Sequence, residues 1–549
     1  MTDRFSLRRF LRRQTAGSKS LNVRLLPVLA CCMLALLLQA RGQPSYVRVE
    51  GTHLALDGKP YYFLGSNFWY GFYLGSPGQT GQHERLLREL DRMKAIGIDN
   101  LRILGGSELS QLTNSVTPAI QTSPGVYDDS LLAGLDLLLS EMAKREMHAV
   151  VVLNNFWEWS GGMAQYHSWF GGGPVKDPAV EGYAAFVNYS AAFYRNAEAN
   201  AGFRRFISDL VRRRNTVTGV SYYEDPVIMA WELANEPRPG MDATYVQAYS
   251  AWMDSTAGYI HSLDPNHLVT TGHEGTAGCL GSEQIFLDAH QSPFIDYVTI
   301  HIWAYNWGWF NPYDIPGTYP AALSKAKSYF RQHLALAHEL HKPLVLEEFG
   351  LTRDSMRYAE GTPTLARNDY YEELLSLVYD SARAGTAVAG SNFWGWGGEA
   401  RCTHSDFRWR AGDPFMCDPP MERQGINSVF DTDSSTHSVL AEHAALMVDL
   451  RESAWVDPGV IPSAFRLEQN YPNPFNSSTV IRLHVPVGSQ VDLRVFDVVG
   501  REVCVLLDGW KEPGVHVVRL SGENLATGTY FCRLMAATAV QTTKMILLH

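Results

Sequence analysis

The amino-acid sequence predicts an α/β fold: a (β/α)8 TIM barrel followed by a small C-terminal β-sandwich. Between residues 46 and 451, apolar strand-like runs alternate with amphipathic helix-like segments. Eight such units in about 400 residues are typical of a barrel with long loops. After Trp455 the pattern changes to short alternating runs separated by glycine, which are typical of a sandwich.

The eight strand candidates are apolar runs, most of which end in polar or aromatic residues. They cover residues 61–70, 99–104, 148–155, 227–236, 267–275, 296–306, 343–350 and 390–399. The segments between them, such as HERLLRELDRMKAIG from His83, have the amphipathic pattern of helices. A doubly wound open sheet is the alternative, but no glycine-rich phosphate loop follows the first strand candidate.

The two ends of the chain carry signals of their own. Several arginines precede an apolar run at residues 25–40, which predicts an export signal. That run is shorter than a membrane-spanning helix requires. The predicted organisation is a signal peptide at 1–43, the barrel at 44–455, a proline-containing linker at 456–466 and the sandwich at 467–549.

The composition argues against several classes of function. The formal net charge is −11, and no long basic run occurs beyond the N-terminus, so we expect no nucleic-acid partner. Neither a CxxC nor an HExxH motif occurs, so we expect no metal and no cofactor. Fourteen tryptophans are a high count, and their flat rings suit sugars. We expect a monomer.

Removal of the predicted signal peptide leaves five cysteines. Because an exported chain can be oxidised, we expect one disulfide between Cys402 and Cys417 and another between Cys504 and Cys532. Each pair lies within one predicted domain. The alternative is that all five thiols are reduced and buried.

Polar and aromatic residues stand at the C-terminal ends of seven strand candidates. In chain order they are Arg102, Asn154, Asn155, Asn235, Glu236, His273, Glu274, His301, Trp303, Trp307, Glu347, Glu348, Trp394, Trp396 and Glu399. In a barrel these ends and the following loops build the active site. Two carboxylates at facing strand ends suit cleavage of a glycosidic bond, because one protonates the leaving oxygen while the other attacks the anomeric carbon or activates water.

Four motifs make nearly all of residues 46–451 resemble retaining glycoside hydrolases of family 5. They are Arg102 in NLRIL, WELANEPR from Trp231, HIW from His301 and LEEFG from Leu346. Two longer stretches, LNNFWEWSGGMAQY from Leu153 and RRRNTVTGVSYYEDPVIMAWELANEPR from Arg212, resemble the endo-β-1,4-mannanases within that family. The resemblance implies a secreted retaining enzyme that hydrolyses internal bonds of mannan, galactomannan or glucomannan.

The resemblance also implies roles for individual residues. Glu236 would be the acid/base, Glu348 the nucleophile, and Asn235 would bind the sugar 2-hydroxyl. Arg102 and His301 would orient the pair. Further residues expected at the substrate are Trp69, Tyr70, Asn154, Trp157, Glu274, Trp303, Trp307 and, as the floor beneath the sugar, Trp394.

The sequence departs from the family pattern at two places. Many members have Tyr where this chain has Trp303, so we expect the hydrogen bond to the nucleophile to come from elsewhere. Mannanases often read Asn-x-Tyr-Trp on the first strand, whereas this chain reads NFWY from Asn67, so either Trp69 or Tyr70 could stack on the sugar.

Two further glutamates need separate interpretation. Because strand side chains alternate, we expect Glu347 to face the helices while Glu348 faces the barrel axis. Glu347 is then a carboxylate behind the site or a packing residue. Glu232 shares the face of Glu236 at a deeper position, and we interpret it as a paired interior group.

The C-terminal segment resembles the sorting domain that the type IX secretion machinery recognises. The resemblance is carried by LEQNYPNPFNSSTVIRLHVP from Leu467 and LATGTYFCRLMAATAVQTTKMILL from Leu525. It implies secretion or cell-surface attachment by way of the periplasm. A plain accessory sandwich or a carbohydrate-binding module is the alternative, although Trp510 is the segment's single tryptophan.

Three other functions remain to be distinguished from a mannanase. A family 5 β-1,4-glucanase would share the glutamate pair and differ only in its loops. A non-catalytic polysaccharide-binding surface protein would not need Glu236 and Glu348. An adhesin would not need the complete set of polar strand ends.

Overall fold

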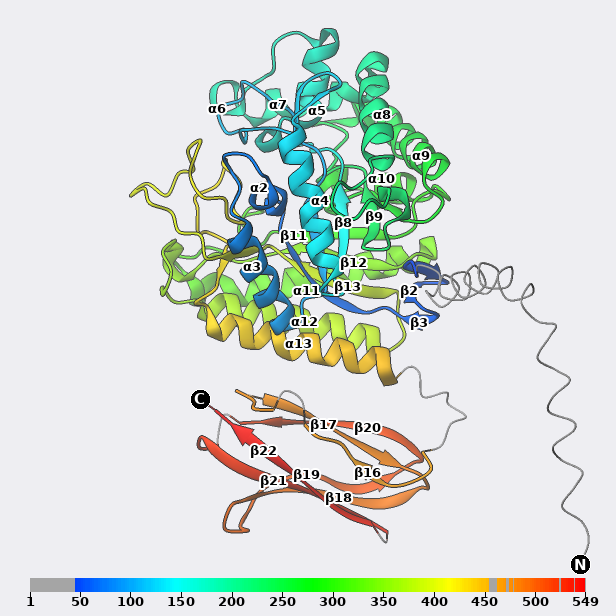
Figure 1. The fold of residues 1–549 in the computed structure, drawn as a ribbon, viewed down its shortest axis with the longest axis vertical. Helices are drawn as coiled ribbons and strands as arrows, with labels where there is room; N and C mark the ends of the chain where they lie inside the picture. The colour runs from blue at the N-terminus through cyan, green and yellow to red at the C-terminus, as the bar shows by residue number, and fades with distance from the viewer. Residues whose placement is uncertain are drawn as a thin grey trace, which may run out of the picture. The chain divides into compact units, whose positions relative to one another are not determined.

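The computed structural model describes residues 45–453, 462–470, 473–476, 478–522, 525–537 and 539–548 (Figure 1). The predicted signal peptide and most of the predicted linker therefore lie outside the described residues. In the described ranges, no helix has the length and apolar character needed to cross a bilayer.

Eight parallel strands form the central sheet. They are β4 (Phe63–Asn67), β5 (Asn100–Leu104), β8 (His148–Val152), β9 (Ile228–Glu232), β10 (Leu268–Thr270), β11 (Val298–Ile302), β12 (Leu344–Phe349) and β13 (Val388–Phe393). The strand order is β10-β9-β8-β5-β4-β13-β12-β11, and a parallel bridge between Thr270 and Tyr297 joins its two ends. The predicted (β/α)8 barrel is confirmed, with each strand candidate supplying one strand.

Helices surround the barrel (Figure 1). The longer ones are α3 (His83–Ile96), α4 (Asp129–Ala143), α8 (Ala197–Val211), α9 (Val246–Leu263), α10 (Glu283–His290), α11 (Ile315–Leu340), α12 (Leu365–Arg383) and α13 (Ser434–Ser453). Local chemistry sets their ends: the Asp128 carboxylate accepts the backbone N–H groups of Ser130 and Leu131 at the start of α4. Gly97, with φ 96°, ends α3.

Shorter helices lie in the loops that follow the strands. They are α2 (Gly71–Gly75), α5 (Gly162–His167), α6 (Pro178–Glu181) and α7 (Tyr183–Ala191). Three of them, α5 to α7, belong to the long connection between β8 and α8. Two short strands, β14 (Trp396–Gly398) and β15 (Val429–Phe430), bracket a second long loop after β13. These insertions account for the length of the barrel domain.

A small antiparallel sheet precedes the barrel and was not predicted. It consists of β1 (Arg48–Glu50), β2 (His53–Leu56) and β3 (Lys59–Pro60). Val47 and Leu54 share a buried cluster with Phe63 and Leu268, the first residues of β4 and β10. Apolar side chains therefore fill the N-terminal end of the barrel, which leaves its C-terminal end for polar groups.

The C-terminal segment is a sandwich of two antiparallel sheets, as predicted. One sheet has the order β16-β17-β20 and the other β19-β18-β21-β22. The strands are β16 (Arg466–Leu467), β17 (Ser478–Val485), β18 (Ser489–Asp497), β19 (Glu502–Lys511), β20 (Gly514–Ser521), β21 (Gly528–Ala536) and β22 (Ala539–Leu547). Ile481, Leu493 and Leu534 pack in its separate core.

The two predicted disulfides are not formed. Cys504 and Cys532 both pair with Val495, from strands on opposite sides of it, so about 9.6 Å separates their backbones. A disulfide requires Cα atoms within about 7 Å. Cys402 is half-buried with its thiol directed at a backbone carbonyl, whereas Cys417 is fully buried. The five cysteines of residues 45–548 are free, and three of them are buried.

Candidate active site

A cavity of about 520 Å³ lies at the C-terminal end of the barrel strands. Its volume is typical of a small-molecule site. Eight predicted site residues line it: Trp157, Asn235, Glu236, Glu274, Trp303, Trp307, Glu348 and Trp394. The structure thus brings together, at one opening, side chains that are up to 237 positions apart in the sequence.

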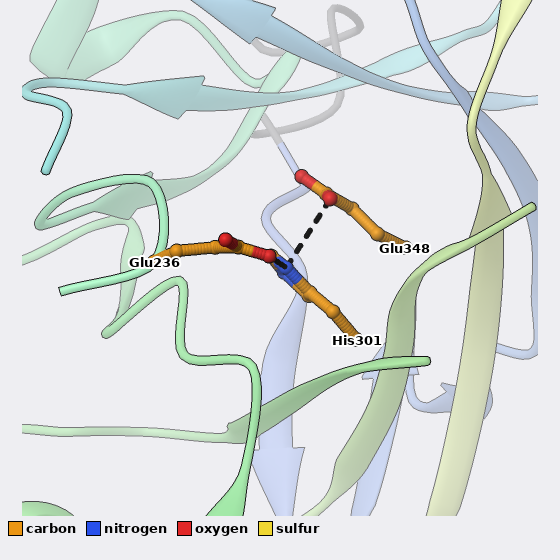
Figure 2. A group of neighbouring side chains, drawn as sticks. All are labelled: Glu236, His301 and Glu348. Atoms are coloured by element: carbon orange, nitrogen blue, oxygen red, sulfur yellow. Dashed lines mark hydrogen bonds and ion pairs between the residues drawn. The ribbon is translucent and has the colours of Figure 1, made fainter. Parts of the chain in front are cut away.

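Glu236 and Glu348 face each other across His301 (Figure 2). Nδ1 of His301 is 2.7 Å from Oε1 of Glu236 and 3.2 Å from Oε2 of Glu348. One oxygen of each carboxylate and a ring nitrogen of His301 all lie within 4.8 Å of one another. Glu236 has φ 49°, a left-handed conformation that costs about 1–3 kcal/mol in a non-glycine residue and clusters at functional sites.

Arg102 holds the carboxylates from β5. It donates to both oxygens of Glu232, at 2.5 and 2.7 Å, and to Oδ1 of Asn235 at 2.8 Å. It also donates to Oδ1 of Asn67 at 3.0 Å and to Oε1 of Glu348. This bidentate pairing confirms Glu232 as a paired interior group. Because Arg102 contacts both Asn235 and Glu348, it also fixes these two residues relative to each other.

Trp303 is the hydrogen-bond donor that we expected to find elsewhere. Its indole Nε1–H donates to Oε2 of Glu348 at 3.1 Å, so that expectation is wrong. An indole N–H is a hydrogen-bond donor, as a tyrosine hydroxyl is, so the change of residue type keeps a donor at this position. The ring also packs edge-on against Trp394, with centroids 5.9 Å apart.

Glu347 does not face the helices as we predicted. The pairing of β11 with β12 passes from Leu346 directly to Glu348, so Glu347 is an extra, unpaired residue. Such a bulge breaks the alternation of side chains. The Glu347 carboxylate consequently lies inside the barrel, 3.7 Å from Nε of Arg102 and 3.5 Å from Nε2 of His301. It does not line the cavity, in keeping with a position behind the site.

The carboxylates determine where protons are held. Burial disfavours the charged ring of His301, but Glu348 and Glu236 outweigh that effect and raise its pKa to about 10. Burial also raises the pKa of Glu348, against the opposing effects of His301 and Arg102. For Glu236 the burial penalty is outweighed by His301, Arg238 and Trp157, which lower its pKa to about 2. These shifts favour a proton on His301, whose Nδ1 lies 2.7 Å from Oε1 of Glu236.

Arg238 and Glu274 form an ion pair beside Glu236. Their closest atoms are 2.5 Å apart, and the Arg238 guanidinium lies 4.8 Å from the ring centroid of Trp157. The indole N–H of Trp157 donates to Oε2 of Glu236 at 2.6 Å. Burial raises the pKa of Glu274 to about 8 although Arg238 opposes it. We did not predict Arg238, although its place two residues after Glu236 was a usable signal.

Besides Arg102 and His301, which contact the carboxylates from within the barrel, three predicted site residues do not line the cavity. Trp69 is buried and packs against Trp159, a lining residue, with ring centroids 5.3 Å apart. Tyr70 is buried, and its hydroxyl donates to the backbone carbonyl of Trp396 at 2.8 Å. Asn154 is also buried, and its Oδ1 accepts the backbone N–H of the next residue. Their contact with a substrate stays a prediction.

Several lining residues come from loops and were not predicted. They are Tyr183, Val187, Arg238, Met241, Tyr305, Asn306, Pro419, Met421 and Glu422. Glu422 adds a fourth carboxylate to the wall, beside Glu236, Glu274 and Glu348, and burial together with Asp418 raises its pKa to about 8. It lies in the loop between β14 and β15, where no strand end marks it in the sequence.

The trio Glu236, His301 and Glu348 is the group within the described ranges whose donor atoms are close enough to hold a cation. Arg102 already contacts Glu348, and His301 donates to Glu236. With these positive groups in place, the trio is built to share a proton rather than to bind a metal.

Comparisons with known proteins agree with this geometry. Residues 44–452 match the family model described as GH family 5 beta-mannosidase-like, and residues 469–548 match a secretion system C-terminal sorting domain. A putative mannan endo-1,4-beta-mannosidase 9 of Oryza sativa subsp. japonica is 30% identical over 65% of this chain and 82% of its own.

Solved structures of family 5 mannosidases and mannanases are also similar to this chain. The glycoside hydrolase family 5 mannosidase of Rhizomucor miehei has a TM-score of 0.69 and 33% identity, covering 74% of this chain and 99% of that one. The endo-1,4-beta-mannanase of the same organism has a TM-score of 0.56 and 25% identity, covering 74% and 100%. The chain belongs to the mannosidase-like group of glycoside hydrolase family 5 and carries a type IX secretion sorting domain.

Proposed function

We propose that this protein is a secreted, retaining endo-β-1,4-mannanase. The observation that carries the proposal is the carboxylate pair, whose oxygens lie within 4.8 Å around one histidine nitrogen. Retaining glycosidases separate their carboxyl groups by about 5–5.5 Å, whereas inverting ones need roughly 6.5–9.5 Å to admit a water. The names of the relatives support β-1,4-linked mannan as the substrate.

The reaction follows from this pair. Glu236 donates a proton to the glycosidic oxygen while a carboxylate oxygen of Glu348 attacks the anomeric carbon, which breaks the bond and leaves a glycosyl ester on Glu348. Glu236, now a carboxylate, takes a proton from water, and the resulting hydroxide displaces Glu348 from the anomeric carbon. Two displacements restore the original configuration.

His301 supplies the proton for the first step. Its Nδ1 lies 2.7 Å from Oε1 of Glu236, so proton transfer between them requires no rearrangement. When a sugar displaces solvent from the cavity, the lower dielectric favours neutralising the charged pair by this transfer. Arg102 and Trp303 keep hydrogen bonds on Glu348, which sustain it as the anionic nucleophile.

The cavity wall supports a polymeric substrate. Trp157, Trp307 and Trp394 present ring surfaces along it, and Tyr183 and Met241 stay about half exposed at its rim. Aromatic faces at successive positions suit successive sugar rings.

A β-mannosidase that releases single mannose units from chain ends is the second candidate. It is favoured by the higher TM-score of the Rhizomucor mannosidase, 0.69 against 0.56 for the endo-mannanase. A mutant of that mannosidase is described in complex with mannosyl-fructose. Initial products from linear manno-oligosaccharides separate the two: internal cleavage releases short oligosaccharides, whereas terminal cleavage releases mannose alone.

The test is an assay of purified residues 44–455 on mannan, galactomannan, cellulose and xylan. We expect the fastest release of sugars from mannan. NMR of the first product gives its anomeric configuration, and an inverted product would exclude double displacement. Faster release from cellulose would make the protein a family 5 glucanase.

We propose the same domain limits as the sequence predicted, and a route to the cell surface or medium by way of the periplasm. The sorting-domain match at residues 469–548 supports export. A signal peptide at residues 1–43 would direct the first step, across the inner membrane, and the sandwich the second. We propose that the enzyme acts as a monomer.

A further inference from the structure

Glu347 is a buried carboxylate that the proposed reaction does not use. It is 1% exposed, and neither of its oxygens has a hydrogen-bond partner of good geometry within the described residues. Two cationic groups lie near it: Nε2 of His301 at 3.5 Å and Nε of Arg102 at 3.7 Å. A buried charge without a partner is costly, so one of these two groups should be its functional partner.

Arg102 is already fully engaged. A guanidinium has five N–H donors. In Arg102 these donate to the two oxygens of Glu232, to Asn67, to Asn235 and to Glu348. None remains for Glu347. His301 is therefore the donor available to it.

The surroundings of the His301 ring define its protonation. Nδ1 lies 2.7 Å from Glu236 and 3.2 Å from Glu348, while Nε2 lies 3.5 Å from Glu347. A ring nitrogen that faces an ionised carboxylate is favoured as an N–H donor, because its lone pair would be repelled. Both nitrogens face carboxylates, which favours the cationic ring and, against the effect of burial, raises its pKa to about 10.

We propose that Glu347 is a positioning residue: its carboxylate holds the proton on Nε2 of His301 and thereby keeps Nδ1–H directed at Glu236 and Glu348. The bulge in β12 makes this arrangement possible, because it turns the consecutive carboxylates of Glu347 and Glu348 toward opposite nitrogens of the His301 ring. The consequence for activity rests on the proposed roles of Glu236 and Glu348; the protonation of the ring does not.

Other charged groups also act on the ring or on Glu347. From the neighbouring elements they are Arg102, Glu232, His273, Glu274 and Tyr297, in addition to the two carboxylates of the cavity. Glu232 offers a matched control. It is a fully buried glutamate at similar depth, but both of its oxygens bond to Arg102 and neither bonds to His301.

The experiment is NMR of ¹⁵N-histidine in the full mature chain, with the His301 signals identified by their loss in His301→Gln. In the wild type we expect both ring nitrogens to be protonated at about pH 8. A neutral ring there would overturn the proposal without any variant. In Glu347→Gln the titration midpoint should fall by about one pH unit or more. An unchanged midpoint would equally overturn it.

Glu232→Gln should move the midpoint less than Glu347→Gln, since it removes a charge but no contact to the ring. A larger effect of Glu232→Gln would mean that the ring responds only to summed charge, against the proposal. On mannan, the alkaline limb of kcat/KM for Glu347→Gln should shift down with the midpoint. If the wild type did not hydrolyse mannan, the proposed function would fail while the ring titration still decided the role of Glu347.

Discussion

Replacing Trp303 with phenylalanine tests how strongly one indole N–H supports the nucleophile. The change removes the 3.1 Å hydrogen bond to Glu348 but keeps an aromatic ring against Trp394. A hydrogen bond to a charged group is worth about 1.5–3 kcal/mol. Because 3.1 Å is at the long end of the usual range, we expect ~1.5 kcal/mol, which is about a tenfold loss in kcat/KM.

The assay is the pH profile of kcat/KM on a soluble mannan. Loss of a donor to the anion raises the pKa of Glu348, which burial already raises, so the acid limb should move to higher pH. Trp303→Tyr supplies a hydroxyl donor and should recover part of the loss. Equal melting temperatures for both variants and wild type would show an intact fold. Activity of Trp303→Phe within about twofold of wild type, with an unmoved acid limb, would refute the reasoning.

Four further outcomes are expected. Glu236→Gln and Glu348→Gln should each reduce turnover by several orders of magnitude with unchanged circular dichroism; a fully active variant would remove that residue from the mechanism. Burial lowers the pKa of His333 to about 4, so folding stability should fall as the pH drops below about 6.5, the unfolded value, and His333→Gln should lessen that loss in urea titrations. Deletion of residues 467–549 should preserve activity on soluble mannan but leave the enzyme in the periplasm; release without lysis would contradict the sorting role. Thiol titration of the denatured mature chain should count five free thiols, and a count of three or one would restore one or both disulfides.

The sequence predicted the barrel well because strands that are buried on both faces appear in the sequence as continuous apolar runs. Most central strands are largely apolar runs, and many of the polar residues of the site stand where the strands end. The positions of Asn235, Glu236 and Glu348 followed from that regularity. The strands β1 to β3 were missed because they are only two to four residues long and show no lasting alternation.

The wrong predictions at the site concern residues whose side-chain direction does not follow from the regular alternation of a strand. A one-residue bulge inverted the expected direction of Glu347, and nothing in the letters LEEFG marks a bulge. For Trp303 we assumed that a change of residue type removes a donor, although indole carries an N–H as well. Glu422 sits on a loop, where periodicity gives no information about direction. The failed pairing of Cys504 and Cys532 depended on strand order, which cysteine spacing does not encode.

The closure of the barrel has a consequence for how the chain is made. β4 and β13 are neighbours in the sheet, yet Asn67 and Phe393, which are hydrogen-bonded across them, are 326 residues apart. Until the last strand emerges, β4 keeps a free edge of unpaired backbone groups. Contacts of such long sequence separation form slowly, because the chain loses loop-closure entropy before the contacts contribute any stabilisation. The barrel therefore cannot close until residue 393 has been synthesised, and the chain up to that point carries an incomplete sheet.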